Sequence, residues 1–199
     1  IGSYAGNENQ GAGSVAIGSQ CGQFSQSFSA VAIGNLAGYT NQGAMSIAIG
    51  DSAGQYNQSG GIAIGDNAGR TGQQASAVAL GSSAGNVDQS ANAIAIGNNA
   101  GNTTQGISAV AIGVDAGTSV QSDYAVAIGA SSGQFAQGTG SIAMGYQAGQ
   151  ETQGIHAVAI GVNSGNQSQG GAGVAIGHDA GYFDQGDESI AIGHEAGQT

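Results

Sequence analysis

The sequence predicts an all-β fold, a parallel β-solenoid of about twelve turns, from its period and its glycines. Ile1 has a counterpart every sixteen residues up to Ile192, apart from one step of fifteen between Ile49 and Ile64. A unit this short cannot bury a core alone, so its turns must stack. The chain holds 40 glycines in 199 residues, which disfavours helices because each interior glycine costs about 1 kcal/mol. We expect residues 1–199 to form a single array, a segment of a longer fibrous chain.

The positions of the repeat are numbered here from the isoleucine column, so that Ile1 and Ile17 both occupy position 1. Positions 15 and 16 and the next position 1 show Val-Ala-Ile or a close variant, and branched residues favour strands. Because alternate strand residues share a face, the invariant alanine should line a narrow interior. The branched columns should then form an apolar strip that other copies cover. The predicted assembly interface comprises Val15, Ile17, Val31, Ile33, Val110, Ile112, Val126, Ile128, Val158 and Ile160.

Glutamine occupies position 10 in all twelve repeats that reach it. At a strand spacing of about 4.8 Å, each side-chain amide can donate to the carbonyl of the next and so satisfy a buried polar group. A glutamine-rich binding face is the alternative interpretation. The predicted structural ladder includes Gln42, Gln58, Gln105 and Gln153.

Glycines at positions 2 and 6 predict two corners in each turn, where the backbone needs a positive φ or cannot accept a Cβ. The short repeat lacks one residue after Gln58, in the segment Ser59–Gly61. A pair of glycines allows a tighter corner there. We therefore expect Ile62 and Ile64 to stay in their columns.

The segments Ser14–Gly18, Ala109–Gly113 and Ala157–Gly161, each followed after two further residues by a small residue, resemble the head repeats of trimeric autotransporter adhesins. They are also similar to repeats in virus and phage fibres. The resemblance covers essentially the whole chain, although the adhesin repeat is about two residues shorter than this one. It implies a left-handed β-roll, a homotrimer with Val and Ile at or near the shared core, and a role in attachment at a cell or virion surface.

The charge balance excludes several partners. The chain has twelve acidic residues and a single basic one, Arg70, which opposes binding to nucleic acids or anionic membranes and keeps an apolar rod soluble.

No apolar run approaches eighteen residues, so we predict no membrane insertion in this segment. Cys21 stands in a column of small residues and should be a buried, inert thiol. The composition agrees with an extracellular, cell-surface or virion-surface setting.

Aromatic residues gather after the second glycine of the repeat. They are candidate contacts with a host surface protein or glycan, and equally with neighbouring chains. These candidates are Phe24, Tyr39, Tyr56, Phe135, Tyr182 and Phe183.

Two histidines, His178 and His194, occupy position 3 of successive repeats, and an acid follows each. They are candidate ligands of a divalent metal. Ordinary surface variation is the alternative, and we assign neither a metal nor a cofactor from the sequence.

The fixed columns contain only Gly, Ala, Val, Ile and Gln, which supply no general acid, base or nucleophile, so we predict no catalytic residue and no enzyme. The favoured function is a structural shaft or head segment of a surface fibre or adhesin. An ice-binding solenoid and a silk-like extracellular cross-β material are the alternatives.

Overall fold

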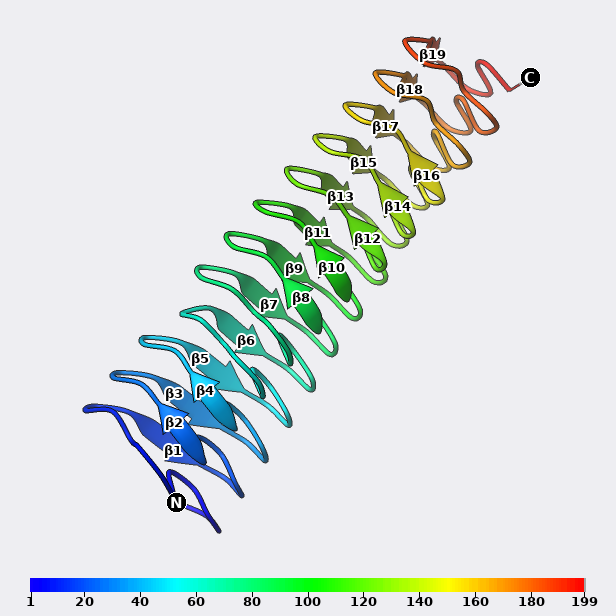
Figure 1. The fold of residues 1–199 in the computed structure, drawn as a ribbon. Coiled ribbons are helices and arrows are strands. Elements are labelled where there is room, and N and C mark those ends of the chain that lie inside the picture. The colour runs from blue at the N-terminus through cyan, green and yellow to red at the C-terminus, as the bar shows by residue number, and fades with distance from the viewer. Residues whose placement is uncertain (199) are drawn as a thin grey trace.

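The computed structural model describes residues 1–198 and shows a β-solenoid in which successive turns stack into a straight rod (Figure 1). The described residues contain short strands and turns and no helix. One strand per turn joins a parallel sheet of twelve strands that runs the length of the rod. Eleven turns therefore separate the first and last strands of this sheet. This arrangement confirms the predicted β-solenoid. With the partial turns at both ends, the number of turns agrees with the predicted value of about twelve.

The twelve-stranded sheet contains the Val-Ala-Ile segments in chain order. Its strands are β1 (Val15–Ile17), β3 (Val31–Ile33), β5 (Ile47–Ile49), β6 (Ile62–Ile64), β7 (Val78–Leu80), β9 (Ile94–Ile96), β11 (Val110–Ile112), β13 (Val126–Ile128), β15 (Ile142–Met144), β17 (Val158–Ile160), β18 (Val174–Ile176) and β19 (Ile190–Ile192). Every pairing keeps the repeat register, for example Val110 opposite Val126. Bonds run to both neighbouring turns: the amide of Val110 donates to the carbonyl of Ala125 (2.9 Å), and that of Gly113 donates to Ile96 (2.8 Å).

The opposite side of the coil carries strands of two or three residues that end at the glutamine of position 10. They are β2 (Phe24–Gln26), β4 (Thr40–Gln42), β8 (Val87–Gln89), β10 (Thr103–Gln105), β12 (Val120–Gln121), β14 (Ala136–Gln137) and β16 (Thr152–Gln153). They form one sheet of five strands and one of two. Single bridges such as Tyr56 to Thr71 continue the ladder between them.

Alanine side chains fill the space between the two sides. The alanines of position 16, such as Ala95 and Ala111, are fully buried and pack with those of position 5, such as Ala100. Cys21 takes the place of one of these alanines and is also fully buried. Burial raises the pKa of its thiol above the ordinary value, which agrees with the predicted inert role.

From Gln42 to Gln185, the glutamines of position 10 are buried beside the alanines and form a continuous ladder. Nine consecutive side-chain bonds run from Gln42 to Gln185, and in each the amide nitrogen donates to Oε1 of the next turn. The same nitrogen also donates a hydrogen bond across the coil to the backbone carbonyl of a strand, as from Gln105 to Ile94 (2.8 Å). The predicted structural ladder is therefore confirmed, and these residues are not a binding face.

The ladder is incomplete near its first turns. Oε1 of Gln26 and Oε1 of Gln42 are buried without a hydrogen-bond partner. The amides of Gln10 and Gln26 instead donate to backbone carbonyls, including that of Val15 for Gln26 (2.9 Å). Each unpaired acceptor carries a desolvation cost that the later turns avoid.

The corners confirm the two glycine columns and add places that the sequence did not mark. Gly97, at position 2, has a φ of 129°, and Gly101, at position 6, has a φ of 51°. Positions 4 and 13 also have positive φ values, although residues other than glycine occupy them in most repeats, as at Leu36 (56°) and Tyr124 (61°). Closure of the coil imposes this conformation at the same place in each turn, against the local preference of such side chains.

Candidate assembly surface

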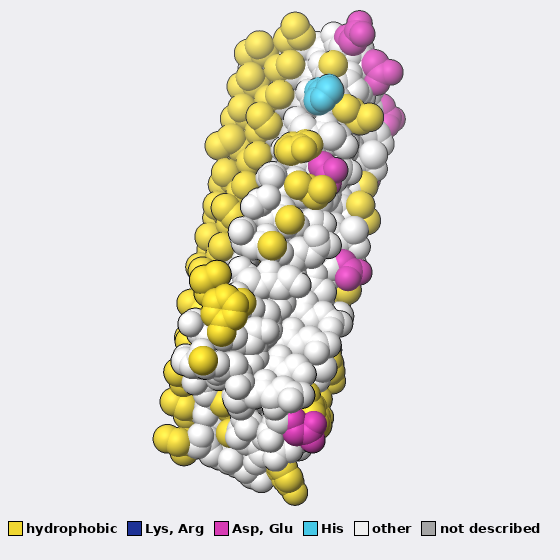
Figure 2. Space-filling model, turned by 60° about the vertical axis from the view of Figure 1, so that its left-hand side comes forward, with side chains coloured by type: hydrophobic (Ala, Val, Ile, Leu, Met, Phe, Trp, Pro, Cys, Tyr) yellow, Lys and Arg dark blue, Asp and Glu magenta, His cyan; other side chains and the backbone are white. Residues whose placement is uncertain are grey.

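The branched residues of positions 15 and 1 point outward from the twelve-stranded sheet and form a continuous apolar strip. Figure 2 shows it as the yellow band along the left side of the rod. The strip is defined by the outward side chains of the twelve strands, two from each. All ten residues of the predicted assembly interface belong to it.

Most strip residues are partly buried because their counterparts in the neighbouring turns lie beside them, and exposure rises to 72% for Ile190 and 64% for Ile192 in the last strand. Ile96 is 36% exposed and Ile160 is 37% exposed. What remains accessible is therefore the outward surface of each side chain. The alternating burial of strands such as β11 shows that the alanine between them lies inside the coil, as predicted.

The coil does not need the strip to fill its own interior. Alanine and glutamine already occupy that space, and the strip side chains lie on the other side of the sheet. In a solitary chain this aliphatic surface would meet water along the whole rod. Such a long apolar patch is unusual on a soluble monomer.

Apolar residues beyond the two columns widen this surface in places. At position 3, which follows the strip, Val114 is 51% exposed and Tyr146 is 53% exposed. At the corner that precedes the strip, Met45 is 68% exposed and Ile155 is 58% exposed. The repeat pattern does not predict these residues, because their positions vary from repeat to repeat and form no fixed column.

The predicted aromatic contacts lie on the other side of the coil, and five of the six form two groups. Rings of Phe24 and Tyr39 meet edge to face at 5.4 Å, and Tyr39 meets Tyr56 at 6.1 Å. Tyr182 and Phe183 form a second edge-to-face pair at 4.4 Å.

Their exposure differs in a way the sequence did not show. Three of them, Phe24, Tyr39 and Tyr182, are half-buried. Phe135, in contrast, is 51% exposed and Phe183 is 48% exposed. The structure therefore makes Phe135 and Phe183 the more accessible of the predicted contacts.

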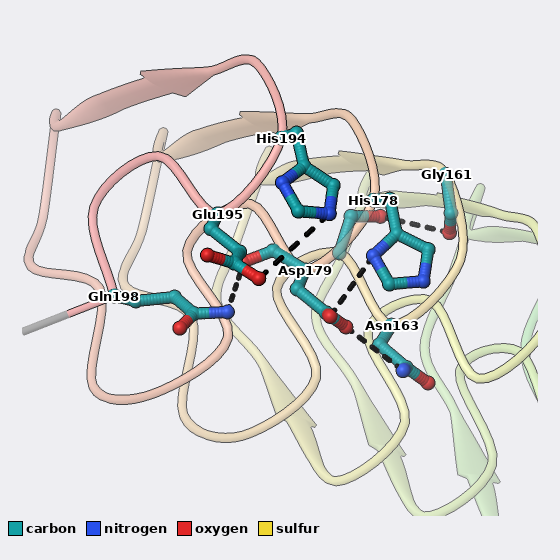
Figure 3. A network of polar contacts seen from close by, with 8 residues as sticks. Gly161, Asn163, His178, Asp179, His194, Glu195 and Gln198 are labelled. Carbon is teal, nitrogen blue, oxygen red and sulfur yellow. Dashed lines mark hydrogen bonds and ion pairs between the residues drawn. The ribbon is translucent and has the colours of Figure 1, made fainter.

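The two histidines of position 3 lie directly above one another, as Figure 3 shows. Their rings stack with centroids 5.2 Å apart and an interplanar angle of 18°. Nδ1 of His178 lies 2.9 Å from Oδ2 of Asp179, and Nε2 of His194 lies 3.7 Å from Oε1 of Glu195. No group of three or more His, Cys, Asp and Glu side chains suited to a metal occurs within residues 1–198.

Several acids have a structural part in the coil. Asn35 donates to Asp51 (2.8 Å), and the carboxylate of Asp123 accepts a bond from the amide of Ile107 (2.8 Å). Both bonds join adjacent turns. These carboxylates therefore reinforce the stacking, and they do not converge into a paired site of the kind that acid–base chemistry uses.

A scan against protein-family models and searches of curated proteins and of solved structures found no match to this chain. A long, apolar helix able to cross a membrane is likewise not found among residues 1–198.

Proposed function

We propose that this chain is a structural segment of a surface fibre or adhesin, and that identical copies assemble through the apolar strip. The observation that carries the proposal is the strip itself, which is continuous over twelve strands and plays no part in filling the coil. A fibre needs a stiff element that repeats along its axis. Backbone bonds between every pair of turns and the inner glutamine ladder supply that stiffness.

The size of the strip supports association with other copies. Two side chains from each of twelve strands give 24 branched or long apolar side chains. A stable protein interface uses about 20–30 residues on each side. Identical rods carry this surface in the same repeat, so copies that lie side by side can match turn for turn.

A homotrimer is the assembly we favour. Three rods around one axis would turn all three strips toward a shared core, and closed rotational symmetry is the usual form of homo-oligomers. The resemblance to adhesin head repeats supports three copies rather than two. The remaining faces would keep their polar and acidic residues in water.

A role outside the cell, on a cell or virion surface, follows from this proposal together with the acidic composition. The net charge of −11 would keep densely placed fibres apart. A host surface protein or glycan would meet the variable residues of the corners and of the smaller sheets. Phe135 and Phe183 are the most accessible of the six predicted aromatic contacts, and aromatic side chains often dominate such interfaces.

The test is the mass in solution of the wild type and of two variants, by native mass spectrometry and sedimentation. Ile112→Asp places a carboxylate in the strip, and burying that charge between copies is costly. Val120→Asp is the matched control, because Val120 lies in the same turn on the opposite side of the coil and is 50% exposed. We expect a discrete trimer for the wild type and for Val120→Asp, and its loss in Ile112→Asp.

A compact wild-type monomer that tolerates Ile112→Asp would refute assembly through the strip. A mass that grows without limit as concentration rises would instead identify a cross-β material of many chains. A stable dimer would retain the strip as the interface and reject the trimer.

A further inference from the structure

We propose that His178 and His194 together bind one divalent transition-metal ion of the Zn²⁺ class through their two imidazoles, with water completing the coordination. The site goes beyond the structural role, and it lies within a single chain. Its basis is the arrangement of two histidines on adjacent turns with a carboxylate beside each ring (Figure 3).

The environment of His178 prepares one nitrogen for a metal. With Asp179 at 2.9 Å, Nδ1 of the neutral ring carries the proton and donates a hydrogen bond to the carboxylate. Nε2 then keeps its lone pair. A carboxylate that orients a histidine in this way is the usual outer partner of a metal-binding imidazole.

Asp179 is itself held in place from the preceding turn. Nδ2 of Asn163 donates to its Oδ1 at 2.9 Å, and the other oxygen of the carboxylate faces His178. The chain Asn163–Asp179–His178 therefore crosses from one turn to the next and fixes the position of the ring. Asp179 is only 19% exposed, so solvent screens this orientation less than it would at an open surface.

His194 supplies the second nitrogen. It stands one turn above His178, and at 67% side-chain exposure its ring is free to rotate. The 3.7 Å separation from Glu195 is too long for a hydrogen bond, so neither nitrogen of this ring is committed to a partner. In the stacked pair the two rings are nearly parallel, with a centroid separation of 5.2 Å.

Binding requires the ring of His194 to tilt toward Nε2 of His178. A metal–nitrogen distance of about 2.1 Å brings the two nitrogens within about 4.2 Å of each other. His194 can make this movement without disturbing the coil, because its imidazole is exposed and is not packed in the interior. Imidazole nitrogens suit Zn²⁺, Ni²⁺ and Cu²⁺, whereas Mg²⁺ prefers oxygen ligands.

The test is a titration of the purified chain with Zn²⁺, followed by calorimetry and by the ¹⁵N signals of the histidine rings, with Mg²⁺ as the negative control. We expect one Zn²⁺ per chain and shifts confined to His178 and His194. His178→Ala and His194→Ala should each weaken binding at least tenfold. His156→Ala is the matched control, because His156 is also exposed but belongs to the opposite corner of the coil, and it should bind Zn²⁺ as the wild type does.

Asp179→Asn tests the orienting carboxylate separately, and we expect a loss of affinity of about tenfold with both histidines still present. Zn²⁺ binding of unchanged strength in the double variant His178→Ala/His194→Ala would overturn the proposal. So would wild-type ring signals that do not move in millimolar Zn²⁺, or a stoichiometry of one ion for two or more chains.

Discussion

The side-chain amide of Gln58 donates a 2.8 Å hydrogen bond to Oε1 of Gln73, although these residues are fifteen positions apart rather than sixteen. It is the shortest bond of the glutamine ladder, whose other links measure between 3.0 and 3.4 Å. The missing residue is absorbed before β6, where Ile62 and Ile64 pair in register with Ile47 and Ile49. The prediction for this short turn is confirmed.

Two adjacent glutamines allow a direct test of the ladder. Gln73 is fully buried, whereas Gln74 is exposed. Gln73→Leu removes the bonds to Ile62 and Gln89 and leaves buried acceptors unpaired, so we expect the free energy of unfolding to fall by about 1–3 kcal/mol. Gln74→Leu should change it by less than about 0.5 kcal/mol. Equal effects in denaturant melts would contradict a structural role of the ladder.

The closeness of successive turns can be tested at a glycine. A Cβ added to Gly97 would lie 2.5 Å from the carbonyl oxygen of Gly113, and φ there is 129°. Gly97→Ala should therefore destabilise the fold by about 1–3 kcal/mol from backbone strain alone, with more from the clash. Gly186→Ala is the control, because nothing lies within 4 Å of its added Cβ. Thermal unfolding of both variants measures the difference. Equal unfolding temperatures of Gly97→Ala and Gly186→Ala would contradict the need for glycine at this close contact between turns.

The narrow interior predicts that alanine cannot be enlarged. Ala79 is fully buried, while Ala75, earlier in the same turn, is exposed. Ala79→Leu should lower the free energy of unfolding by about 1–3 kcal/mol because the extra methylenes force the two sides of the coil apart. Ala75→Leu should leave it nearly unchanged. Should Ala79→Leu prove as stable as the wild type, the interior would have spare volume that the structure does not show.

Cys21 should react slowly with alkylating reagents until the chain unfolds. Its thiol is fully buried, and burial raises its pKa above the ordinary value, so the reactive thiolate is scarce in the folded state. Because the unfolded thiol ionises first as pH rises, this group lowers stability above about pH 8.5 and contributes nothing below it. Cys21→Ala should remove that part of the pH dependence. Rapid native labelling at pH 7.5 would contradict the buried position.

The sequence by itself determined the solenoid, the alternation of its strands and the place of its ladder. Each of these depends on a residue type that recurs at one position, and stacking converts a recurring position into a column of contacts. Strand alternation alone predicts that the side chains of Val110 and Ile112 point outward and that the side chain of Ala111 points inward. The register of the short turn follows from where its residue is missing.

Only the tertiary structure decided the features that depend on closure of the coil. Leu36 and Tyr124 adopt positive φ because their turns must close, although neither side chain favours that conformation. The amide of Gln105 reaches the carbonyl of Ile94 only because the two sides lie close together. The exposure of Val114 and Tyr146 beside the strip likewise depends on how each corner places its side chains. The same is true of the contact between His178 and Asp179. Residue type alone does not specify those directions, since they are set by neighbours one full turn away.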